Sequence, residues 1–243
     1  RGHNLPVYFG NRNWHPFASE TAEKMSQDGV RKVAVFATSA WGGYSACRQY
    51  DEDIQQMREH LAEQGLPDIE FTKIRQFFDH PKFVVEMAAA VTEVWGQVPE
   101  EKKESTRMLF TAHSVPVAHD NVGGVEGDKN LYSRQVAEAS RLVASQAHIS
   151  DYDLVWQSRS GNPRTPWLEP DIVDHTTDIH HNEGIDTVVV CPIGFISDHM
   201  EVIWDLDSEL QKAADEMGVK VLRTRTAGPT PRFAEMVVDL IDE

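Results

Sequence analysis

The sequence lacks the features that mark several common protein classes. Its only cysteines, Cys47 and Cys191, lie far apart, and each is flanked by small or apolar residues. This usage is typical of a reducing compartment, where cysteine acts as a small hydrophobic residue. No apolar run approaches the roughly 20 residues needed to cross a bilayer, and no signal-peptide core follows the first residues. We therefore expect a cytoplasmic protein without a transmembrane segment.

Basic residues are also in short supply. The chain has 23 Lys and Arg against 39 Asp and Glu, which gives a net charge of -16. A nucleic-acid partner is excluded, because a phosphate backbone requires a basic surface. An acidic surface attracts cations, but it also serves solubility, and charge alone does not decide between these uses.

Several catalytic and phosphate-binding motifs are absent. The sequence contains no Gly-x-Gly-x-x-Gly, no phosphate loop with Lys-Ser/Thr, no Gly-x-Ser-x-Gly and no His-Glu-x-x-His. These absences argue against dinucleotide binding, nucleotide hydrolysis by a phosphate loop, serine hydrolase chemistry and zinc-helix proteolysis.

Short apolar runs instead alternate with amphipathic stretches along the whole chain. This alternation predicts an α/β protein with two Rossmann-like domains, whose parallel sheets are flanked by helices. Expected strands cover 7–9, 32–38, 70–74, 108–112, 154–157, 187–191 and 220–223. Expected helices cover 20–27, 51–64, 81–95, 131–147, 171–182, 200–217 and 232–242.

We place the first domain at 1–80 together with 228–243, and the second at 81–227. Little sequence precedes the first expected strand, so we expect the first domain to lack an N-terminal segment. Ligands of open parallel sheets bind beyond the carboxyl ends of the strands, which directs attention to the loops that follow them.

One such loop begins with His113, directly after an apolar strand. A lone histidine there is more often structural, but neutral imidazole is also a good metal ligand and proton acceptor.

On the helix after Cys191, three carboxylates recur every four residues, at Glu201, Asp205 and Glu209. A solvated acidic face is the ordinary interpretation. The apolar residues between them favour half-buried carboxylates that need a cation or shared protons. We expect Ser197 or Asp198 to cap this helix.

Two further loops carry aromatic residues. Trp156 and Trp167 lie near Arg159 and Arg164, a combination that suits a flat ligand bearing carboxylates, although Trp167 also fits a packed surface loop. The segment 41–50 combines paired glycines with Tyr44 and Tyr50, which could line an apolar cleft.

Taken together, these motifs resemble the signatures of ferrochelatases, in order and spacing. The resemblance covers essentially the whole chain and rests on Thr-Ala-His-Ser-Val-Pro at 111–116, Trp-Gln-Ser at 156–158, Pro-Trp-Leu-Glu-Pro at 166–170, Pro-Ile-Gly-Phe at 192–195 continuing to Asp205, Gly-Asn-Arg-Asn-Trp-His-Pro-Phe at 10–17 and Phe-Asp-His-Pro at 78–81.

The resemblance implies chelatase-type domains that bind a porphyrin and insert Fe²⁺, here the substrate metal. It assigns His113 and Glu201 to the insertion site, and Asp205 and Glu209 to an acidic ladder leading away from it. Tyr50 matches a tyrosine near the porphyrin centre, with Gln49 or Tyr44 as alternatives, while Trp156 would contact the macrocycle. Whether His113 ligates iron or accepts a proton stays open.

The resemblance also bears on cofactor, substrate and assembly. Cys47 matches one ligand of an iron–sulfur cluster found in some members, but the other cysteines are absent, so no cluster is predicted. The motifs resemble those of bacterial members of the coproporphyrin III type. This resemblance favours coproporphyrin III as substrate, with Fe-coproporphyrin III (coproheme) as product, and protoporphyrin IX is the alternative substrate. A chelatase for cobalt or nickel, or a non-catalytic tetrapyrrole-binding protein, would share these features. We expect a monomer.

Overall fold

The computed structural model describes residues 4–43, 48–123, 128–162 and 164–243. The chain divides into two compact units, each described here by itself. Unit 1 comprises Arg1–Ala37 and Ser45–Arg75, and unit 2 comprises Thr38–Tyr44 and Gln76–Glu243. No described helix is both long enough and apolar enough to cross a membrane.

Unit 1 contains a small parallel sheet and two helices. Its elements are α1 (Ala18–Gln27), β1 (Lys32–Val35), α2 (Tyr50–Glu63) and β2 (Glu70–Lys73), and the two strands pair with each other in parallel. The helices pack together over a core that includes Met25, Leu61 and Ile69. The expected strand at 7–9 does not form: these residues have no strand partner, and the side chains of Val7 and Phe9 are exposed.

Unit 2 is built on a four-stranded parallel sheet. Its strands are β3 (Thr106–His113), β4 (Tyr152–Gln157), β5 (Thr187–Cys191) and β6 (Lys220–Arg223), in the order β4-β3-β5-β6. The two central strands are almost entirely buried, as expected for parallel strands covered on both faces. Their apolar runs therefore predicted both the strands and the two-sided cover.

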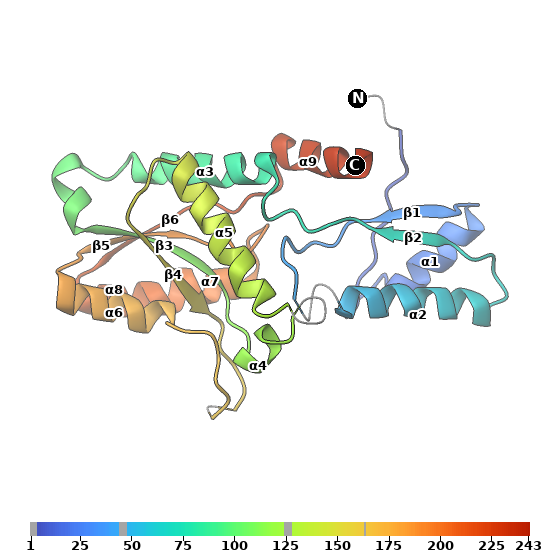
Figure 1. Cartoon of the computed structure of the whole chain (residues 1–243), viewed down its shortest axis with the longest axis horizontal. Coiled ribbons are helices and arrows are strands. Elements are labelled where there is room, and N and C mark those ends of the chain that lie inside the picture. The colour runs from blue at the N-terminus through green and yellow to red at the C-terminus, as the bar shows by residue number, and fades with distance from the viewer. Residues whose placement is uncertain (1–3, 44–47, 124–127, 163) are drawn as a thin grey trace. The chain divides into compact units, whose positions relative to one another are not determined.

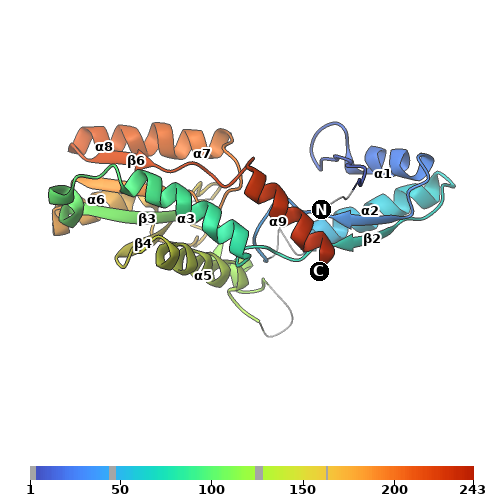
Figure 2. The same cartoon turned by 90° about the horizontal axis from the view of Figure 1, so that it is seen from above.

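Helices cover both faces of this sheet (Figures 1 and 2). Leu109, Val155 and Val190 point to one face, where they pack against α6 (Ile172–Glu183) and the segment that contains α7 (Met200–Trp204) and α8 (Gln211–Met217). The other face carries α3 (Pro81–Trp95) and α5 (Leu131–Gln146), which contact each other. Two short helices, the 3₁₀-helix η2 (Glu100–Ser105) and α4 (Val117–Asp120), complete the connections.

The C-terminal helix α9 (Pro231–Asp242) lies in unit 2, where it packs on α3. This differs from our expected boundaries, which grouped 228–243 with 1–80. The reason is a buried contact: Met236 and Leu240 are buried, the Phe233 ring meets Phe77, and Arg232 forms an ion pair with Glu86 of α3. An amphipathic pattern predicts that a helix is covered on one side, but not which element covers it.

The expected helix at 200–217 is not one regular α-helix. Residues Asp205–Leu210 form a π-helix, η3, between α7 and α8. The helical run ends where expected, because Gly218 adopts a left-handed conformation with φ 76°. Local sequence signals mark helix ends, but the residue pattern of 200–217 does not predict the change to the i→i+5 backbone hydrogen bonds of a π-helix.

Candidate active site

The carboxyl edge of the unit 2 sheet gathers polar side chains from separate strands. β3 ends at His113, which is in register with Gln157 at the end of β4. β5 ends at Cys191 and leads through a turn to α7, and β6 ends at Arg223. Because all four strands are parallel, these ends meet at the same edge, where ligands of such sheets bind.

His113 is held from two sides. Its backbone carbonyl accepts a hydrogen bond of 2.8 Å from the Tyr132 hydroxyl, and its Nδ1 contacts the carbonyl oxygen of Ser114. A carbonyl only accepts, so Nδ1 carries the hydrogen in this contact. In the neutral ring, Nε2 is then left with a free lone pair. The side chain is 36% exposed, so a ligand can reach that nitrogen.

Glu201 faces this lone pair from the first turn of α7. Its Oε2 lies 3.7 Å from Nε2 of His113, and its side chain is 57% exposed. This separation is too long for a good hydrogen bond. It is short enough for one divalent ion to bind both atoms, since two metal–ligand bonds of about 2.1 Å can span it. The pair can thus bind a cation or transfer a proton.

His199, not Ser197 or Asp198, occupies the N-cap of α7. Its Nδ1 accepts a hydrogen bond of 3.3 Å from the backbone N–H of Glu201. The expected capping residue was wrong because Asp198 has a stronger partner, the guanidinium of Arg223 at 3.0 Å. The cap therefore places a second imidazole beside the backbone of Glu201.

Asp205 lies at the junction of α7 and the π-helix. Its Oδ2 accepts a hydrogen bond of 3.2 Å from Gln157 and a very short contact from the hydroxyl of Ser158. Ser158 has a left-handed backbone with φ 64°, which turns its side chain out of the strand direction. The end of β4 thus holds this carboxylate.

Glu209 is exposed on the π-helix, and none of the described residues forms a hydrogen bond or ion pair with its carboxylate. The π-helix winds more residues into a turn than an α-helix does, so Glu209 does not continue a straight row from Asp205. In the described residues, no three His, Cys, Asp or Glu side chains approach closely enough to hold one metal ion. The structure brings His113 and Glu201 together, and leaves the other two carboxylates apart from them.

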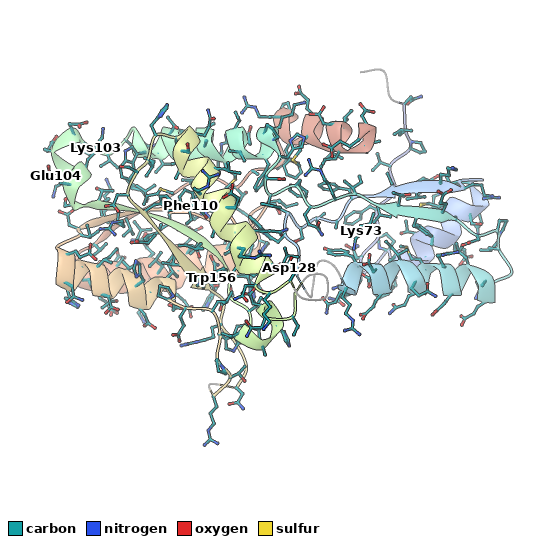
Figure 3. The ribbon with its side chains drawn as sticks, in the orientation of Figure 1. Lys73, Lys103, Glu104, Phe110, Asp128 and Trp156 are labelled. Atoms are coloured by element: carbon teal, nitrogen blue, oxygen red, sulfur yellow. The ribbon has the colours of Figure 1, made fainter. Side chains whose placement is uncertain are left out.

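Trp156 lies inside unit 2, only 4% exposed, next to Tyr132 of α5 with ring centroids 5.8 Å apart (Figure 3). In this arrangement it supports the residues around His113 from within and does not present a face to a ligand. Val155 points to the other side of the sheet, so strand alternation placed Trp156 under α5. From the sequence, a bulky residue at a strand end was equally consistent with a buried position and with a position that faces a ligand.

Tyr50 begins α2 in unit 1. The guanidinium carbon of Arg12 lies 5.2 Å from its ring centroid, and Arg12 also forms a bidentate pair with the two carboxylate oxygens of Asp53. Tyr44 and Cys47 lie outside the described residues, whereas Cys191 is a buried free thiol. Of the loop arginines, Arg159 lies 3.8 Å from the exposed Glu169.

Sequence reasoning missed two residues that organise this edge. Tyr132 supports His113 through its hydroxyl, and Arg223 binds carboxylates on both sides of α7. Neither belongs to a motif that we singled out. The only available signal for Arg223 was its position at the end of a predicted strand, at the edge where ligands bind.

The fold of this chain is similar to the folds of solved chelatases. SirB from Bacillus subtilis, with Fe³⁺, matches 99% of this chain and 83% of its own with a TM-score of 0.67 at 12% identity. The sirohydrochlorin chelatase SirB from Bacillus subtilis subspecies spizizenii, in complex with cobalt, matches 95% of this chain and 76% of its own, with a TM-score of 0.58 at 13% identity. At such identities the likeness concerns the fold alone.

Comparison of the sequence with protein-family models and with curated proteins identifies the family. The ferrochelatase family model matches residues 1–243, and the chain belongs to the ferrochelatase family. Coproporphyrin III ferrochelatase of Corynebacterium glutamicum is 58% identical over 243 residues, which are 100% of this chain and 65% of that protein. Coproporphyrin III ferrochelatase of Corynebacterium diphtheriae is 56% identical over 250 residues, which cover 100% of this chain and 67% of that protein. The chain thus spans about two thirds of the length of these relatives.

Proposed function

We propose that this protein inserts Fe²⁺ into a porphyrin, with coproporphyrin III as the porphyrin and Fe-coproporphyrin III as the product. The observation that carries the proposal is the approach of His113 Nε2 to Glu201 Oε2, 3.7 Å apart at the carboxyl edge of a ferrochelatase-family sheet. The choice of coproporphyrin III is supported by the names of relatives that are 58% and 56% identical.

The reaction replaces two protons by one metal ion. The free porphyrin loses the protons of two pyrrole N–H groups, while Fe²⁺ exchanges its water ligands for four ring nitrogens. Nε2 of His113 has the free lone pair, so it is the atom that accepts each of the two pyrrole protons in turn, once the preceding proton has been passed on. The positive charge that then develops on the imidazole lies beside the Glu201 carboxylate, which stabilises it.

Glu201 also provides the exit for that proton and the approach for the metal. More than half of its side chain is exposed, so it can exchange protons and cations with water. Asp205 lies one turn away, held by Gln157 and Ser158, and Glu209 lies further along on the exposed side of the π-helix. We assign these two carboxylates to the supply of iron toward Glu201.

The porphyrin contacts are assigned more broadly. We keep Tyr50 and Tyr44 as candidates for contact with the macrocycle, since both follow the paired glycines of the 41–50 segment. Trp156 is assigned a supporting role because its ring is buried against Tyr132. Binding that distorts the flat ring would expose its N–H groups to His113, using contacts at the periphery.

The proposal is tested by anaerobic incubation of the full-length protein with Fe²⁺ and either porphyrin, following the absorbance change on metal insertion. Coproporphyrin III should give the higher kcat/KM. His113→Ala should lower kcat by about 100-fold or more, because it removes the base at the insertion site.

A second histidine in unit 2 provides a matched control. His175 also contacts a carboxylate, with Nε2 2.9 Å from Oδ2 of Asp153, and Asp153 lies near the amino end of β4. His175→Ala should therefore keep iron insertion. Near-full insertion by His113→Ala would refute the assigned base, and a higher kcat/KM for protoporphyrin IX would refute the assigned substrate. A Soret shift without insertion would indicate a binding protein.

A further inference from the structure

Arg223 ties together the two sides of the segment that carries Glu201. Its Nε donates to Oδ1 of Asp207 at 2.7 Å, and its Nη2 donates to the second oxygen of the same carboxylate at 3.0 Å. Its Nη1 donates to Oδ1 of Asp198 at 3.0 Å. Asp198 precedes α7 and Asp207 lies in the π-helix, so one guanidinium bridges the loop before α7 and the turn after it.

The segment 198–210 is thereby fastened to both edge strands of the sheet. Asp205 is held by Gln157 and Ser158 at the end of β4, whereas Asp207 is held by Arg223 at the end of β6. β4 and β6 lie at opposite edges in the order β4-β3-β5-β6, and His113 ends the strand next to β4. Glu201 lies between these attachments, facing His113.

Arg223 also compensates an unusual concentration of negative charge. Within twelve residues the chain places five carboxylates, at Asp198, Glu201, Asp205, Asp207 and Glu209. Across the described part of the chain, Arg223 is the only arginine or lysine that forms an ion pair with any of them. Partial burial works against its charged form, but the hydrogen bonds to the two aspartates outweigh it, so the pKa of Arg223 is raised.

We propose that Arg223 is a positioning residue for iron insertion: its planar fork fixes α7 and the π-helix so that the Glu201 carboxylate stays opposite His113. The inference rests on the proposed function, in which Glu201 meets the metal. Within the described part of the chain, Arg223 forms no hydrogen bond or ion pair with His113 or Glu201, and it acts through Asp198 and Asp207. Groups that orient a metal-binding carboxylate commonly change metal affinity or activity by about 10- to 100-fold when removed.

The test compares Arg223→Gln with Arg107→Gln in the full-length protein. Arg107 is a matched control, because its side chain is also mostly buried and contacts three carboxylates, those of Asp151, Asp153 and Glu183. It lies near the amino end of β3, at the opposite end of the strand from His113. The two substitutions remove similar ion-pair networks, one near the amino ends and the other at the carboxyl ends of the strands of one sheet.

We expect Arg223→Gln to raise the KM for Fe²⁺ about tenfold, with the KM for coproporphyrin III within about twofold of wild type. Arg107→Gln should change neither KM. A merely structural role of Arg223 would lower the amount of active protein and leave both KM values unchanged, and that result would overturn the inference. An equal rise of the KM for Fe²⁺ in both variants would overturn it as well.

Arg223→Lys separates geometry from charge. Lysine keeps the positive charge but cannot form the bidentate fork, so it should recover only part of the lost affinity for Fe²⁺. Full recovery would mean that charge alone suffices and would overturn the positioning role. This variant is also the more conservative one should Arg223→Gln fold poorly.

Amide hydrogen exchange of residues 199–210 provides a readout that needs no activity. Faster exchange there in Arg223→Gln, but not in Arg107→Gln, supports the inference; unchanged exchange overturns it. If the wild-type protein inserts no iron, the proposed function fails, and the exchange data still decide whether Arg223 fixes this segment.

Discussion

At the scale of the residue, the contact between Nδ1 of His113 and the Ser114 carbonyl oxygen sets the orientation of the imidazole ring. The Ser114 carbonyl takes the Nδ1 hydrogen, so the nitrogen that faces Glu201 is the one with the lone pair. A histidine at a strand end can point either ring nitrogen outward. The backbone turn immediately after β3 makes that choice, and with it defines the atom that can accept a proton.

Cys191 is predicted to be chemically inert in the folded protein. Burial is the main cause that raises the pKa of its thiol to about 12, so almost no thiolate, the reactive form, exists at pH 8. In a Cys47→Ser variant, a disulfide reagent at pH 8 should not react with the native protein. After denaturation in guanidinium chloride the same thiol should react fully.

The pH dependence of this protection has a defined sign. The folded protein keeps the proton on Cys191 more tightly than the unfolded chain, in which the pKa of a thiol is about 8.5. The stabilising contribution is therefore complete below that pH and declines as pH rises toward about 12. Rapid reaction in the native state at pH 8 would contradict the buried position of Cys191 at the end of β5.

The sequence predicted positions along the chain better than directions of side chains. His113, Glu201 and Gln157 were all located at strand or helix ends that form one edge of the sheet. The inward direction of Trp156 was not predictable, because it depends on which face of the sheet α5 covers. The partner of Asp198 was not predictable either, since Arg223 lies 25 residues away in sequence.

At the scale of the element, the loop from β5 to α7 depends on a close approach of two backbones. Gly194 lies against β3 so tightly that an added Cβ would come within 2.6 Å of the Ala112 Cα. Its N–H donates to the Thr111 carbonyl, and its own carbonyl accepts from the Trp41 ring nitrogen at 2.9 Å. The loop is thus seated on the residues that immediately precede His113.

Gly194→Ala should therefore impair insertion as well as stability. The added methyl group forces the loop and β3 apart, which should cost about 1 to 3 kcal/mol in free energy of unfolding. Because Ala112 precedes His113, the shift also disturbs the 3.7 Å separation from Glu201 and should lower kcat about tenfold or more. Thermal unfolding and the iron-insertion assay measure the two effects.

Gly184→Ala provides the control for Gly194→Ala. Gly184 ends α6 with φ +74°, and an added Cβ would meet nothing within 4 Å. Alanine there should cost about 1 kcal/mol through backbone strain, with kcat unchanged, because this turn lies at the amino edge of the sheet. Equal kcat values for the two variants would refute the proposed link between the close packing of Gly194 on β3 and the geometry of the insertion site.

The π-helix shows where local sequence reasoning stops. The four-residue spacing of Glu201, Asp205 and Glu209 predicted one continuous face on a regular helix. The structure keeps the helical direction and the end at Gly218, but winds Asp205–Leu210 more widely. The partners of this segment, Arg223 on β6 and Ser158 after β4, come from distant parts of the chain, and such tertiary contacts are absent from the local pattern.

At the scale of the whole molecule, the α/β class followed from the alternation of apolar and amphipathic stretches. The parallel sheet of unit 2 and its two-sided cover are as predicted. The grouping into units differs from prediction at one helix, and also at Thr38–Tyr44 and 76–80, which belong to unit 2 and not to the first domain. That helix is α9, whose placement depends on side chains of α3 about 150 positions earlier in the chain.

The attachment of α9 to α3 should behave as one cooperative ion-pair cluster. Glu86 of α3 is buried, with a side chain only 5% exposed, and its two oxygens lie 2.7 Å from Arg225 and 2.8 Å from Arg232. Replacing either arginine by alanine leaves the other as partner and should cost about 1 kcal/mol. Replacing both leaves a buried carboxylate without a partner and should cost about 3 to 5 kcal/mol.

Urea denaturation of the two single variants and the double variant measures this excess. If α9 belongs to unit 2, the double variant should lose at least about 1 kcal/mol more than the sum of the singles, and the amides of α9 should exchange faster. Arg141→Ala removes an exposed pair with Glu138 and should change stability by less than about 0.5 kcal/mol. Additive losses, with α9 exchange unchanged in the double variant, would mean that other contacts, such as those of the buried Met236 and Leu240, hold the helix in place.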